Sequence, residues 1–479
     1  MADFEVIVLG LGPGGEDVAG SLAAAGRSVL GVEPRLVGGE CPYFGCIPSK
    51  MLLRGAQVLA EARRVDGMAG HADVTPAFTP VADRIRDEAT DDWDDAVAVR
   101  RLEGKGMTFA RGSGTIRGRD GDRIVVEVEG TTHRAQRVVV ATGTAPVLPP
   151  VEGLAELYTG EPGGPVWTNR EAVRAREVPG SLAVLGGGAI GCELAQGFAR
   201  FGARVSVIEA APRILMPEEP EAAAVIAQVF AREGIAVHQG VAVEEVTRAD
   251  DGGVQLRLDT GRTVRADTVL VAAGRRTNLD IGLATLGLAD RPRTLDVDER
   301  MRVLSPQGSS AGGAAGGAGE PVDGLYAIGD VTGRGAFTHV AIWQAKVLAA
   351  GLLGREQEFG GYRGLAWVTF TDPEVGHAGL TEQQARDAGI AVRTGTQQIA
   401  SNSRGWIHGP GNDGVVKLVA DADRDVLVGA TVVAPNGGEI LGLLTLAVHA
   451  QVPLRLLRSM HYAFPTMHRA VLEALADLG

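Results

Sequence analysis

Two cysteines separated by four residues are the most reactive feature of this sequence. The segment runs Cys41-Pro42-Tyr43-Phe44-Gly45-Cys46, and this spacing alone fits two packed thiols, part of a metal site or a redox-active disulfide. A metal site needs further ligands, and no other His or Cys lies nearby in the sequence. Pro48 suits a first helical turn, and a helix N-terminus lowers the pKa of a thiol and favours the reactive thiolate.

A strand, a glycine-rich turn and a helix precede the cysteine pair. Residues 5–10 form a predicted buried strand, 16–25 a helix and 28–32 a second strand, which together make a β-α-β unit. The turn, Gly10-Leu11-Gly12-Pro13-Gly14-Gly15, fits the G-x-G-x-x-G pattern, whose glycines allow a tight turn, close approach to a pyrophosphate and close helix packing. Glu33, 23 residues after Gly10, can hold a ribose hydroxyl. Because the cysteines follow a dinucleotide site directly, we predict a redox-active disulfide.

The same device occurs a second time. Residues 182–185, 189–201 and 204–208 predict strand, helix and strand around Gly186-Gly187-Gly188-Ala189-Ile190-Gly191. Glu209 lies 23 residues after the first glycine of this turn. A carboxylate there bonds a free ribose 2′-hydroxyl and repels a 2′-phosphate, which predicts a preference for NADH over NADPH. Arg204 and Arg213 lie near Glu209 in the sequence and could act in the opposite direction, although Arg213 is otherwise a surface charge.

Composition limits the class of protein. A chain of 479 residues with 45% hydrophobic residues predicts about three globular domains. The formal charge of −13 argues against nucleic acid and anionic membrane surfaces as partners. The sequence has no apolar run long enough to span a membrane and no basic leader before its first strand, so we expect a cytoplasmic protein. In that reducing compartment a disulfide is more often catalytic than structural.

The remaining sequence predicts further elements. We expect a helix over 49–64, an acidic helical stretch over 82–102, two short strand pairs around 108–116 and 123–128, and a further strand over 137–140. Residues 305–321, rich in Gly, Ala and Ser, predict a flexible surface loop to which we assign no function. Beyond residue 359, strands over 414–420 and 427–433 and helices over 438–450 and 466–478 indicate a separate α+β domain.

Several segments together resemble a known family. Gly38-Gly39-Glu40-Cys41 and Cys46-Ile47-Pro48-Ser49-Lys50 resemble the active-site segment of the class I pyridine nucleotide–disulfide oxidoreductases, which include dihydrolipoamide dehydrogenase, glutathione reductase and mercuric reductase. The similarity covers essentially the whole chain and includes segments 141–143, 273–278, 326–330, 371–374 and 379–381. It implies an α/β fold with two Rossmann-like dinucleotide-binding domains and a C-terminal α+β dimerisation domain. We expect an FAD domain at 1–147 and 279–355, an NAD(P) domain at 148–278 and the dimerisation domain at 356–479.

The resemblance also implies roles for single residues. Cys41 would be the interchange thiol that meets substrate, and Cys46 the charge-transfer thiolate against the flavin. Lys50 and Glu193 would pair beside the flavin N5. Lys50 is one of only four lysines among 46 cationic residues, and a compact ammonium suits that place. Electrons would pass from NAD(P)H through FAD to the disulfide. Cys192 is interpreted as a packed core thiol.

Residues expected to contact FAD or NAD(H) lie in the turns and segments above, and Asp330 would contact the ribityl chain. They are Gly10, Gly12, Pro13, Gly14, Gly15, Glu33, Pro34, Gly39, Glu40, Lys50, Gly114, Ala141, Thr142, Gly143, Gly186, Gly188, Ala189, Ile190, Gly191, Glu209, Gly274, Arg275, Gly329 and Asp330. We predict no metal site. The family resemblance implies a homodimer whose active site is completed by the partner's C-terminal segment.

That C-terminal segment departs from the family pattern. The family has His-Pro-Thr followed by a Glu, an acid–base dyad that serves thiol–disulfide exchange. Here Phe464 takes the place of the His and Arg469 that of the Glu. A positioned general acid is worth about 10²–10⁴-fold in rate, so ordinary disulfide reduction should be slow.

Three hypotheses remain open. His461 or His468 could substitute for the missing histidine. The acceptor could need no proton, as with a quinone, a metal ion or a flavin-level acceptor. Exclusion of a proton could be the purpose, as in the family's ketopropyl-coenzyme M oxidoreductase/carboxylase, which also has Phe at this position. With no cysteine beyond Cys192, we expect substrate to reach Cys41 directly, or electrons to leave from the flavin.

Overall fold

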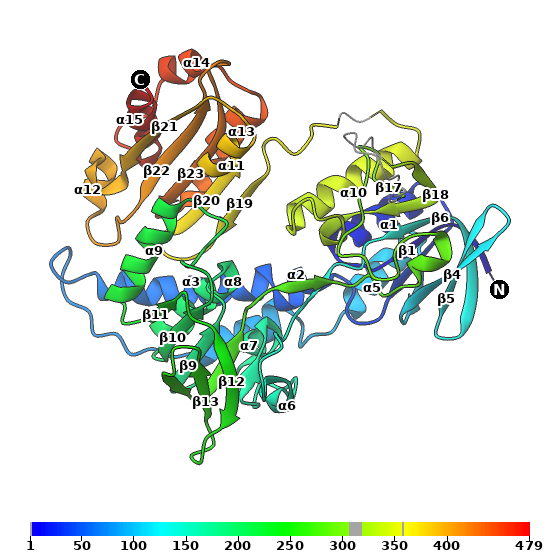
Figure 1. Ribbon diagram of the computed structural model, residues 1–479, viewed down its shortest axis with the longest axis horizontal. Helices are drawn as coiled ribbons and strands as arrows, with labels where there is room; N and C mark the ends of the chain where they lie inside the picture. Colours follow the sequence, from blue (N-terminus) through cyan, green and yellow to red (C-terminus); the bar gives the residue numbers. More distant parts are fainter. Residues whose placement is uncertain (1, 306–318, 357–358) are drawn as a thin grey trace. The chain divides into compact units, whose positions relative to one another are not determined.

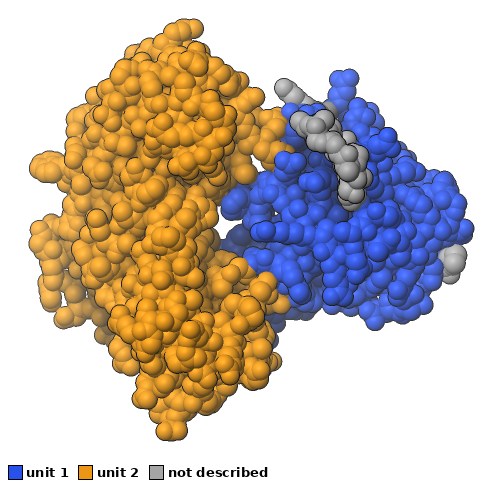
Figure 2. Space-filling model, viewed as in Figure 1, with its two compact units in different colours: residues 1–47, 86–145, 275–359 blue, residues 48–85, 146–274, 360–479 orange. Residues whose placement is uncertain are grey.

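The structure is a computed structural model that describes residues 2–305, 319–356 and 359–479. The chain forms two compact units, shown in Figure 2. Unit 1 comprises residues 1–47, 86–145 and 275–359, and unit 2 comprises 48–85, 146–274 and 360–479. Most of the predicted loop at 305–321 lies outside the described residues, and its last residue, Pro321, begins a strand. Among the described helices, none is long and apolar enough to cross a membrane.

Unit 1 is built on a sheet with a parallel centre (Figure 1). Its parallel strands stand in the order β18-β6-β1-β2-β3, and β17 pairs antiparallel with β18 at the edge. The residues of β1 from Val6 to Leu9 are buried, as expected for a strand covered on both faces. Helices α1 and α10 pack against each other. The bounds are β1 (Ala2–Leu9), α1 (Pro13–Ala24), β2 (Val29–Glu33), β3 (Thr108–Arg111), β6 (Thr131–Val140), β17 (Arg302–Leu304), β18 (Pro321–Ala327) and α10 (Thr338–Leu352).

An antiparallel meander extends this sheet. Strand β4 (Gly114–Asp120) pairs with β5 (Arg123–Val128), which pairs with the first half of β6. Short elements complete the unit: α2 (Glu40–Phe44), α5 (Ala96–Glu103), and the 3₁₀ turns η2 (Leu283–Leu286) and η3 (Gly329–Thr332). The short strands β7 (Thr144–Pro146) and β16 (Arg275–Thr277) lie where the chain leaves and re-enters unit 1.

Unit 2 contains the second dinucleotide-type fold. Its parallel sheet has the order β11-β10-β9-β15-β8, and a separate antiparallel sheet has the order β12-β13-β14. The strands are β8 (Val166–Trp167), β9 (Ser181–Leu185), β10 (Arg204–Glu209), β11 (Ala236–Gln239), β12 (Val243–Arg248), β13 (Val254–Leu258), β14 (Thr263–Ala266) and β15 (Thr268–Val271). The helices are α6 (Leu154–Leu157), α7 (Asn169–Arg174), α8 (Ala189–Arg200) and α9 (Pro220–Arg232).

The long helix α3 (Cys46–Arg63), followed by α4 (Thr79–Arg84), also contributes to unit 2. A Cβ on Gly197 of α8 would lie 2.2 Å from Leu52 Cδ2 of α3. Glycine at this position therefore permits the close approach of α3 and α8.

The C-terminal part of unit 2 is an antiparallel sheet with helices (Figure 1). Its order is β19-β20-β23-β22-β21; α13 packs on β20 and β23, and α15 on β21 and β22. The bounds are β19 (Ala366–Thr369), β20 (Glu374–Gly379), α11 (Glu382–Asp387), β21 (Val392–Gln398), η4 (Ile399–Ser401), α12 (Ser403–His408), β22 (Val415–Asp421), β23 (Val426–Ala434), α13 (Gly437–His449), α14 (Leu454–Ser459), η5 (Met467–Arg469) and α15 (Ala470–Asp477). Unit 2 contains both this sheet and the parallel sheet, so the two units do not separate the three predicted domains. The boundaries of those domains remain predictions.

Two predicted helices are wrong in detail. The stretch 82–102 is not one helix, because a π-helical turn (Ile85–Ala89) and the positive-φ residues Asp91, Asp92 and Trp93 interrupt it before α5. Trp93 Nε1 donates to the Tyr43 carbonyl at 3.1 Å, a tertiary bond that a continuous helix would not place there. The predicted helix over 466–478 starts later, since Thr466 is extended and a 3₁₀ turn precedes α15.

A buried lysine connects three elements of unit 2. The side chain of Lys417 on β22 is 4% exposed, and its Nζ lies 3.0 Å from Glu219, 2.9 Å from Glu221 and 2.9 Å from Glu382. Glu219 precedes α9 and is itself 2% exposed, whereas Glu382 begins α11. The lysine therefore balances carboxylates that would otherwise repel one another.

We predict that Lys417→Met destabilises the protein by about 3–5 kcal/mol, because Glu219 loses its partner while still buried. Arg257→Gln is the matched control, since Arg257 pairs with Glu244 and Glu245 at the surface and should contribute about 0–1 kcal/mol. Thermal unfolding followed by circular dichroism measures both. Equal unfolding midpoints for the two variants would contradict the prediction.

Candidate active site

The two cysteines lie next to each other at the start of two helices of the chain. Cys41 is in α2 and Cys46 begins α3, and both are free thiols. A hydrogen bond to Cys46, together with burial, raises the pKa of Cys41 well above that of an ordinary thiol. Cys46 Sγ lies 3.6 Å from the hydroxyl of Thr338, the first residue of α10. The structure thus brings the predicted pair together in its dithiol form.

The first glycine turn has the geometry of a phosphate cradle. Gly10 has φ 91°, and a Cβ there would lie 2.4 Å from the Ala141 carbonyl oxygen. A Cβ on Gly15 would lie 2.0 Å from the Gly10 oxygen, whereas one on Gly12 would meet nothing within 4 Å. Gly12 caps α1, and Pro13 is its first residue. Two glycines therefore allow close packing, and Gly12 leaves the helix N-terminus open for a pyrophosphate.

The second turn repeats these contacts. A Cβ on Gly186 would lie 2.5 Å from the Ala272 oxygen, and one on Gly191 would lie 1.9 Å from the Gly186 oxygen. Gly188 caps α8, begun by Ala189 and Ile190, and a Cβ on it would again meet nothing within 4 Å. The open positions, Gly12 and Gly188, are equivalent in the two units.

The acids that follow each turn also correspond. Glu33 accepts hydrogen bonds from the Leu11 and Arg35 backbone N–H groups, both at 2.9 Å. Glu209 accepts from the N–H groups of Gly187 at 2.6 Å and Ala211 at 2.7 Å. Each carboxylate thus closes its own glycine turn, and its remaining lone pairs suit a ribose hydroxyl.

The two arginines near Glu209 have other positions. Arg204 begins β10, at the opposite end of that strand from Glu209. Arg213 donates to the carbonyls of Leu215 at 2.6 Å, Met216 at 2.9 Å and Glu218 at 2.7 Å. Its guanidinium therefore organises the loop after β10.

A polar network gathers the other predicted cofactor residues of unit 1. Asp330 accepts from the Thr144 hydroxyl at 2.6 Å, and Arg275 Nε donates to the same hydroxyl at 2.8 Å. Arg275 also pairs with Glu40 at 3.2 Å. Thr142 exchanges two hydrogen bonds with Asn278, at 2.7 and 2.9 Å. The segments ending β6, preceding the cysteines and opening η3 therefore converge.

The remaining predicted glycines differ in their surroundings. Gly39 has φ 67° and caps α2, and Gly329 has φ 77° at the start of η3. A Cβ on Gly143 or Gly274 would meet nothing within 4 Å. One on Gly14 would lie 2.9 Å from the Ala341 oxygen, and one on Gly114 2.5 Å from Leu9 Cδ2. Pro34, directly after β2, is exposed. Gly14 and Gly114 therefore serve packing in this structure.

Lys50 and Glu193 form an ion pair in unit 2. Lys50 Nζ lies 2.8 Å from Glu193 Oε2. The other oxygen, Oε1, accepts from the Phe370 backbone N–H at 2.8 Å, and the Phe370 ring centroid lies 4.6 Å from Lys50 Nζ. Phe370 thus contacts both partners of the pair. A ring and an amide carry no signature of such a role, so sequence analysis missed this residue, as it missed Thr338.

In the C-terminal segment, an aromatic ring occupies the position at which the family pattern has an acid–base residue. Phe464 is 69% exposed, and the Arg469 guanidinium carbon lies 5.6 Å from its ring centroid. His468 Nε2 is 3.5 Å from the Thr466 hydroxyl, and its ring is 5.9 Å from that of Tyr462. His461 is exposed. Within the described ranges, neither histidine forms an ion pair with a carboxylate.

Comparison with known proteins identifies the family. Residues 4–345 match the family described as "Pyridine nucleotide-disulphide oxidoreductase", and residues 365–475 match the dimerisation domain of the same family. The chain belongs to this family. It is 32% identical over 493 residues to a dihydrolipoyl dehydrogenase of Thermus scotoductus, covering 100% of this chain and 98% of the relative. It is 30% identical to one of Geobacillus stearothermophilus, covering 98% and 95%.

Solved structures show the same fold. The HOCl-induced flavoprotein disulfide reductase RclA of Escherichia coli matches with a TM-score of 0.81 and 24% identity, over 99% of both chains. LpdA of Mycobacterium tuberculosis matches with a TM-score of 0.82 and 24% identity, over 100% of both chains. The predicted family, the α/β fold and the oxidoreductase class are therefore confirmed, and membership implies FAD and a redox-active disulfide.

The third cysteine is packed in the core of unit 2. Cys192 in α8 is fully buried, its Sγ lies 3.3 Å from the Gly187 oxygen, and burial raises its pKa to well above the usual value. Across the described part of the chain, no group of three or more His, Cys, Asp or Glu is arranged to hold a metal ion. Cys192 is therefore less accessible than Cys41 and Cys46, which are intermediate and exposed.

Proposed function

We propose that the protein passes electrons from NADH through FAD to the Cys41–Cys46 pair and on to an acceptor other than an ordinary disulfide. The observation that carries this proposal is the contact between the two thiols at the start of α2 and α3. FAD, when bound, supplies the two-electron relay between nicotinamide and disulfide. Reduction of the disulfide takes two electrons and two protons and leaves two thiols.

The residues around the pair support this direction of electron flow. With its pKa raised, Cys41 keeps its proton and can donate a hydrogen bond to Cys46. Thr338 stays within reach of Cys46 Sγ. Gly10, Gly12 and Asp330 would hold the phosphates and ribityl chain of FAD, and Glu33 its ribose. The Lys50–Glu193 pair would act where electrons enter from NADH.

This chain differs from the family pattern at the residues that would serve electron transfer to the acceptor. Phe464 has no exchangeable side-chain proton, and Arg469 offers no carboxylate that could orient a proton donor. A disulfide substrate would release its first thiolate without a proton donor, at a cost of about 10²–10⁴ in rate. This favours acceptors that need no proton there, such as quinones or metal ions. One solved structure with the same fold is a Cu(II) complex of RclA, so Cu(II) belongs among the acceptors to try.

We further propose NADH as the preferred coenzyme and a homodimer as the working form. Glu209 places its carboxylate at the glycine turn, and Arg213 is occupied by backbone carbonyls. The dimerisation domain exposes large apolar side chains, among them Trp406, Leu446 and Phe464. A second copy would cover such side chains, and its C-terminal segment would complete the active site.

The first test addresses the disulfide. In Cys46→Ser, anaerobic reduction by NADH should consume one equivalent fewer of two-electron donor, because the disulfide is lost. NADH-driven reduction of quinone or Cu(II) should fall at least tenfold. Titration with NADH under absorbance detection measures the first, and steady-state assays the second.

Cys192→Ser is the matched control, and it should retain the equivalents and the turnover of the unaltered protein. If Cys46→Ser and Cys192→Ser turn over alike, the disulfide is not on the path. Electrons would then leave directly from the flavin.

The second test restores the missing acid. Phe464→His combined with Arg469→Glu should raise lipoamide and glutathione disulfide reduction about 10²-fold or more, since a general acid returns to the site. Quinone reduction should change less than threefold. Phe464→His alone should gain less, because its ring lacks an orienting carboxylate. No gain in the double variant would show that the proton donor does not limit disulfide reduction.

The third test concerns the coenzyme. Glu209→Gln removes the charge that repels a 2′-phosphate, so the ratio of kcat/KM for NADH over NADPH should fall about tenfold or more. Glu244→Gln, on exposed β12 in the same unit, is the control and should leave the ratio unchanged. A ratio that stays constant in Glu209→Gln would refute the assignment of Glu209.

A further inference from the structure

Three side chains on one face of α8 bind the same short segment of chain. Glu193, Gln196 and Arg200 follow the i, i+3, i+7 spacing that aligns residues along a helix. Each of them has a partner in residues 370–372, which connect β19 to β20. We refer to these three side chains as the α8 stripe.

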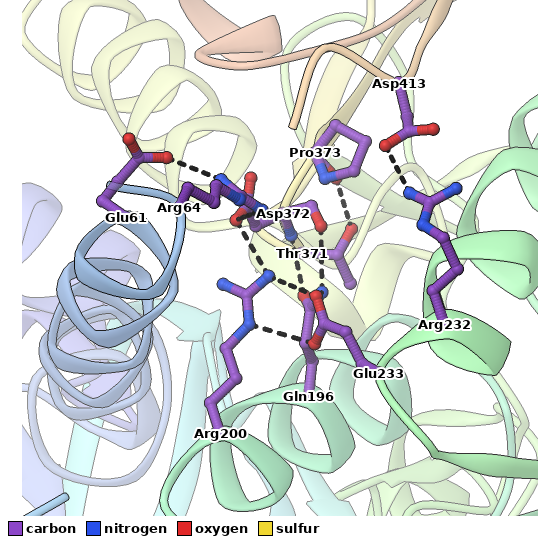
Figure 3. Close-up of polar contacts among 10 residues, drawn as sticks. All are labelled: Glu61, Arg64, Gln196, Arg200, Arg232, Glu233, Thr371, Asp372, Pro373 and Asp413. Atoms are coloured by element: carbon purple, nitrogen blue, oxygen red, sulfur yellow. Dashed lines mark hydrogen bonds and ion pairs between the residues drawn. The ribbon is translucent and has the colours of Figure 1, made fainter. Parts of the chain in front are cut away.

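The contacts along the α8 stripe are specific. Gln196 Oε1 accepts from the Asp372 N–H at 2.7 Å, and its Nε2 donates to the Asp372 carbonyl at 2.9 Å. Arg200 Nη2 lies 2.8 Å from Asp372 Oδ2, as Figure 3 shows. One turn earlier, Glu193 accepts from the Phe370 N–H. The segment is therefore held by its backbone and by its one charged side chain.

These contacts are buried. Gln196 is 0% exposed, and loss of its two bonds would leave an N–H and a carbonyl without water or partner. Burial works against the charge of Arg200, yet Glu233 and Asp372 raise its pKa. Arg200 Nη2 lies 2.6 Å from Glu233 Oε1. With these two carboxylates beside it, the Arg200 guanidinium stays ionised. Its ion pair with Asp372 therefore holds residues 370–372 in place.

The same segment also holds α3. The Phe370 ring lies against the ammonium of Lys50, near the start of α3. Arg64 Nη2, just beyond the end of α3, donates to Asp372 Oδ2 at 3.1 Å (Figure 3). Between these points Gly197 lets the two helices approach closely. Residues 370–372 thus join α3 and α8 at the Lys50–Glu193 pair and again near the C-terminal ends of both helices.

The arginines of this region also line a cleft of about 420 Å³. Arg63, Arg200 and Arg232 lie in the last turns of α3, α8 and α9, where helix carbonyls carry partial negative charge. Asp372, Glu233 and Asp413 add full negative charges beside them. Arg200 and Arg232 are paired with these carboxylates, and Arg63 donates to the Arg200 carbonyl at 3.0 Å, so these arginines join the helices.

We propose that Gln196, Arg200, Asp372 and Arg64 are positioning residues for the Lys50 ammonium. They fix residues 370–372, whose Phe370 then holds both Lys50 and Glu193. Since the dimerisation domain match begins at residue 365, this arrangement makes that domain part of the site where electrons enter. The functional consequence rests on the proposed role of Lys50 in electron entry.

The experiment uses the full-length FAD-loaded protein in four forms: Gln196→Met, Asp372→Asn, Arg64→Gln and the control Arg232→Gln. Arg232 lines the same cleft but pairs with Asp413, away from residues 370–372. Each protein is treated briefly with acetic anhydride, and acetylation at each lysine is quantified by mass spectrometry. The chain has only Lys50, Lys105, Lys346 and Lys417, so every lysine is resolved.

We expect Lys50 acetylation to rise threefold to tenfold in the first three variants and to stay unchanged in Arg232→Gln. Lys417, which is buried elsewhere in unit 2, reports loss of the fold and should stay protected in all four. Arg64→Gln leaves Asp372 paired with Arg200, so it tests the proposal even if Gln196→Met fails to fold. Unchanged Lys50 acetylation, or an equal rise at Lys417, would overturn the proposal.

A second measurement separates positioning from function. In variants with raised Lys50 acetylation, the rate of flavin reduction at saturating NADH should fall about tenfold, with little change in the NADH concentration for half-saturation. Stopped-flow absorbance measures this rate. Raised acetylation with an unchanged rate would uphold the positioning of Lys50 and instead contradict its proposed role in electron entry.

Discussion

Each dinucleotide unit depends on one carboxylate that accepts two backbone N–H groups. Glycines in these turns leave N–H groups without helical or sheet partners, and a buried donor without an acceptor is costly. Glu33 and Glu209 satisfy them at the ends of β2 and β10. Burial raises the pKa of Glu33 above its ordinary value, and the hydrogen bonds from the Leu11 and Arg35 N–H groups offset only part of that effect. The group expected to bind ribose is thus also the group that closes the turn.

Because the same carboxylate closes the turn and is expected to bind ribose, the two units could be predicted from the sequence. Strand, glycine turn, helix and acid are local in the chain, and their spacing follows from the geometry that joins Glu33 to Leu11 and Glu209 to Gly187. The buried strands of both sheets follow from continuous apolar runs. The cysteine pair is local for the same reason, since Cys41 and Cys46 lie on consecutive short elements.

The features that could not be predicted depend on contacts between segments that are far apart in the sequence. The break in the stretch 82–102 depends on the hydrogen bond from Trp93 to the Tyr43 carbonyl. Nothing in the sequence around either residue indicates this contact. Phe370 holds Lys50 and Glu193 through a ring and a backbone amide, groups that every sequence contains in number. Arg275 was placed by resemblance, but its link through Thr144 to Asp330 is visible only in the folded chain.

The C-terminal segment departs from the family pattern at positions 464 and 469 while the fold stays intact. Phe464 and Arg469 still contact each other, as the expected dyad would, but through a cation and a ring face. An arginine cannot release its proton at neutral pH, and a phenyl ring has none to give. His468 lies against Tyr462 and Thr466, and no carboxylate among the described residues forms an ion pair with it, as the second half of a dyad would. On the proposed electron path, the residues for entry are in place, whereas positions 464 and 469 lack the acid and carboxylate of the family pattern.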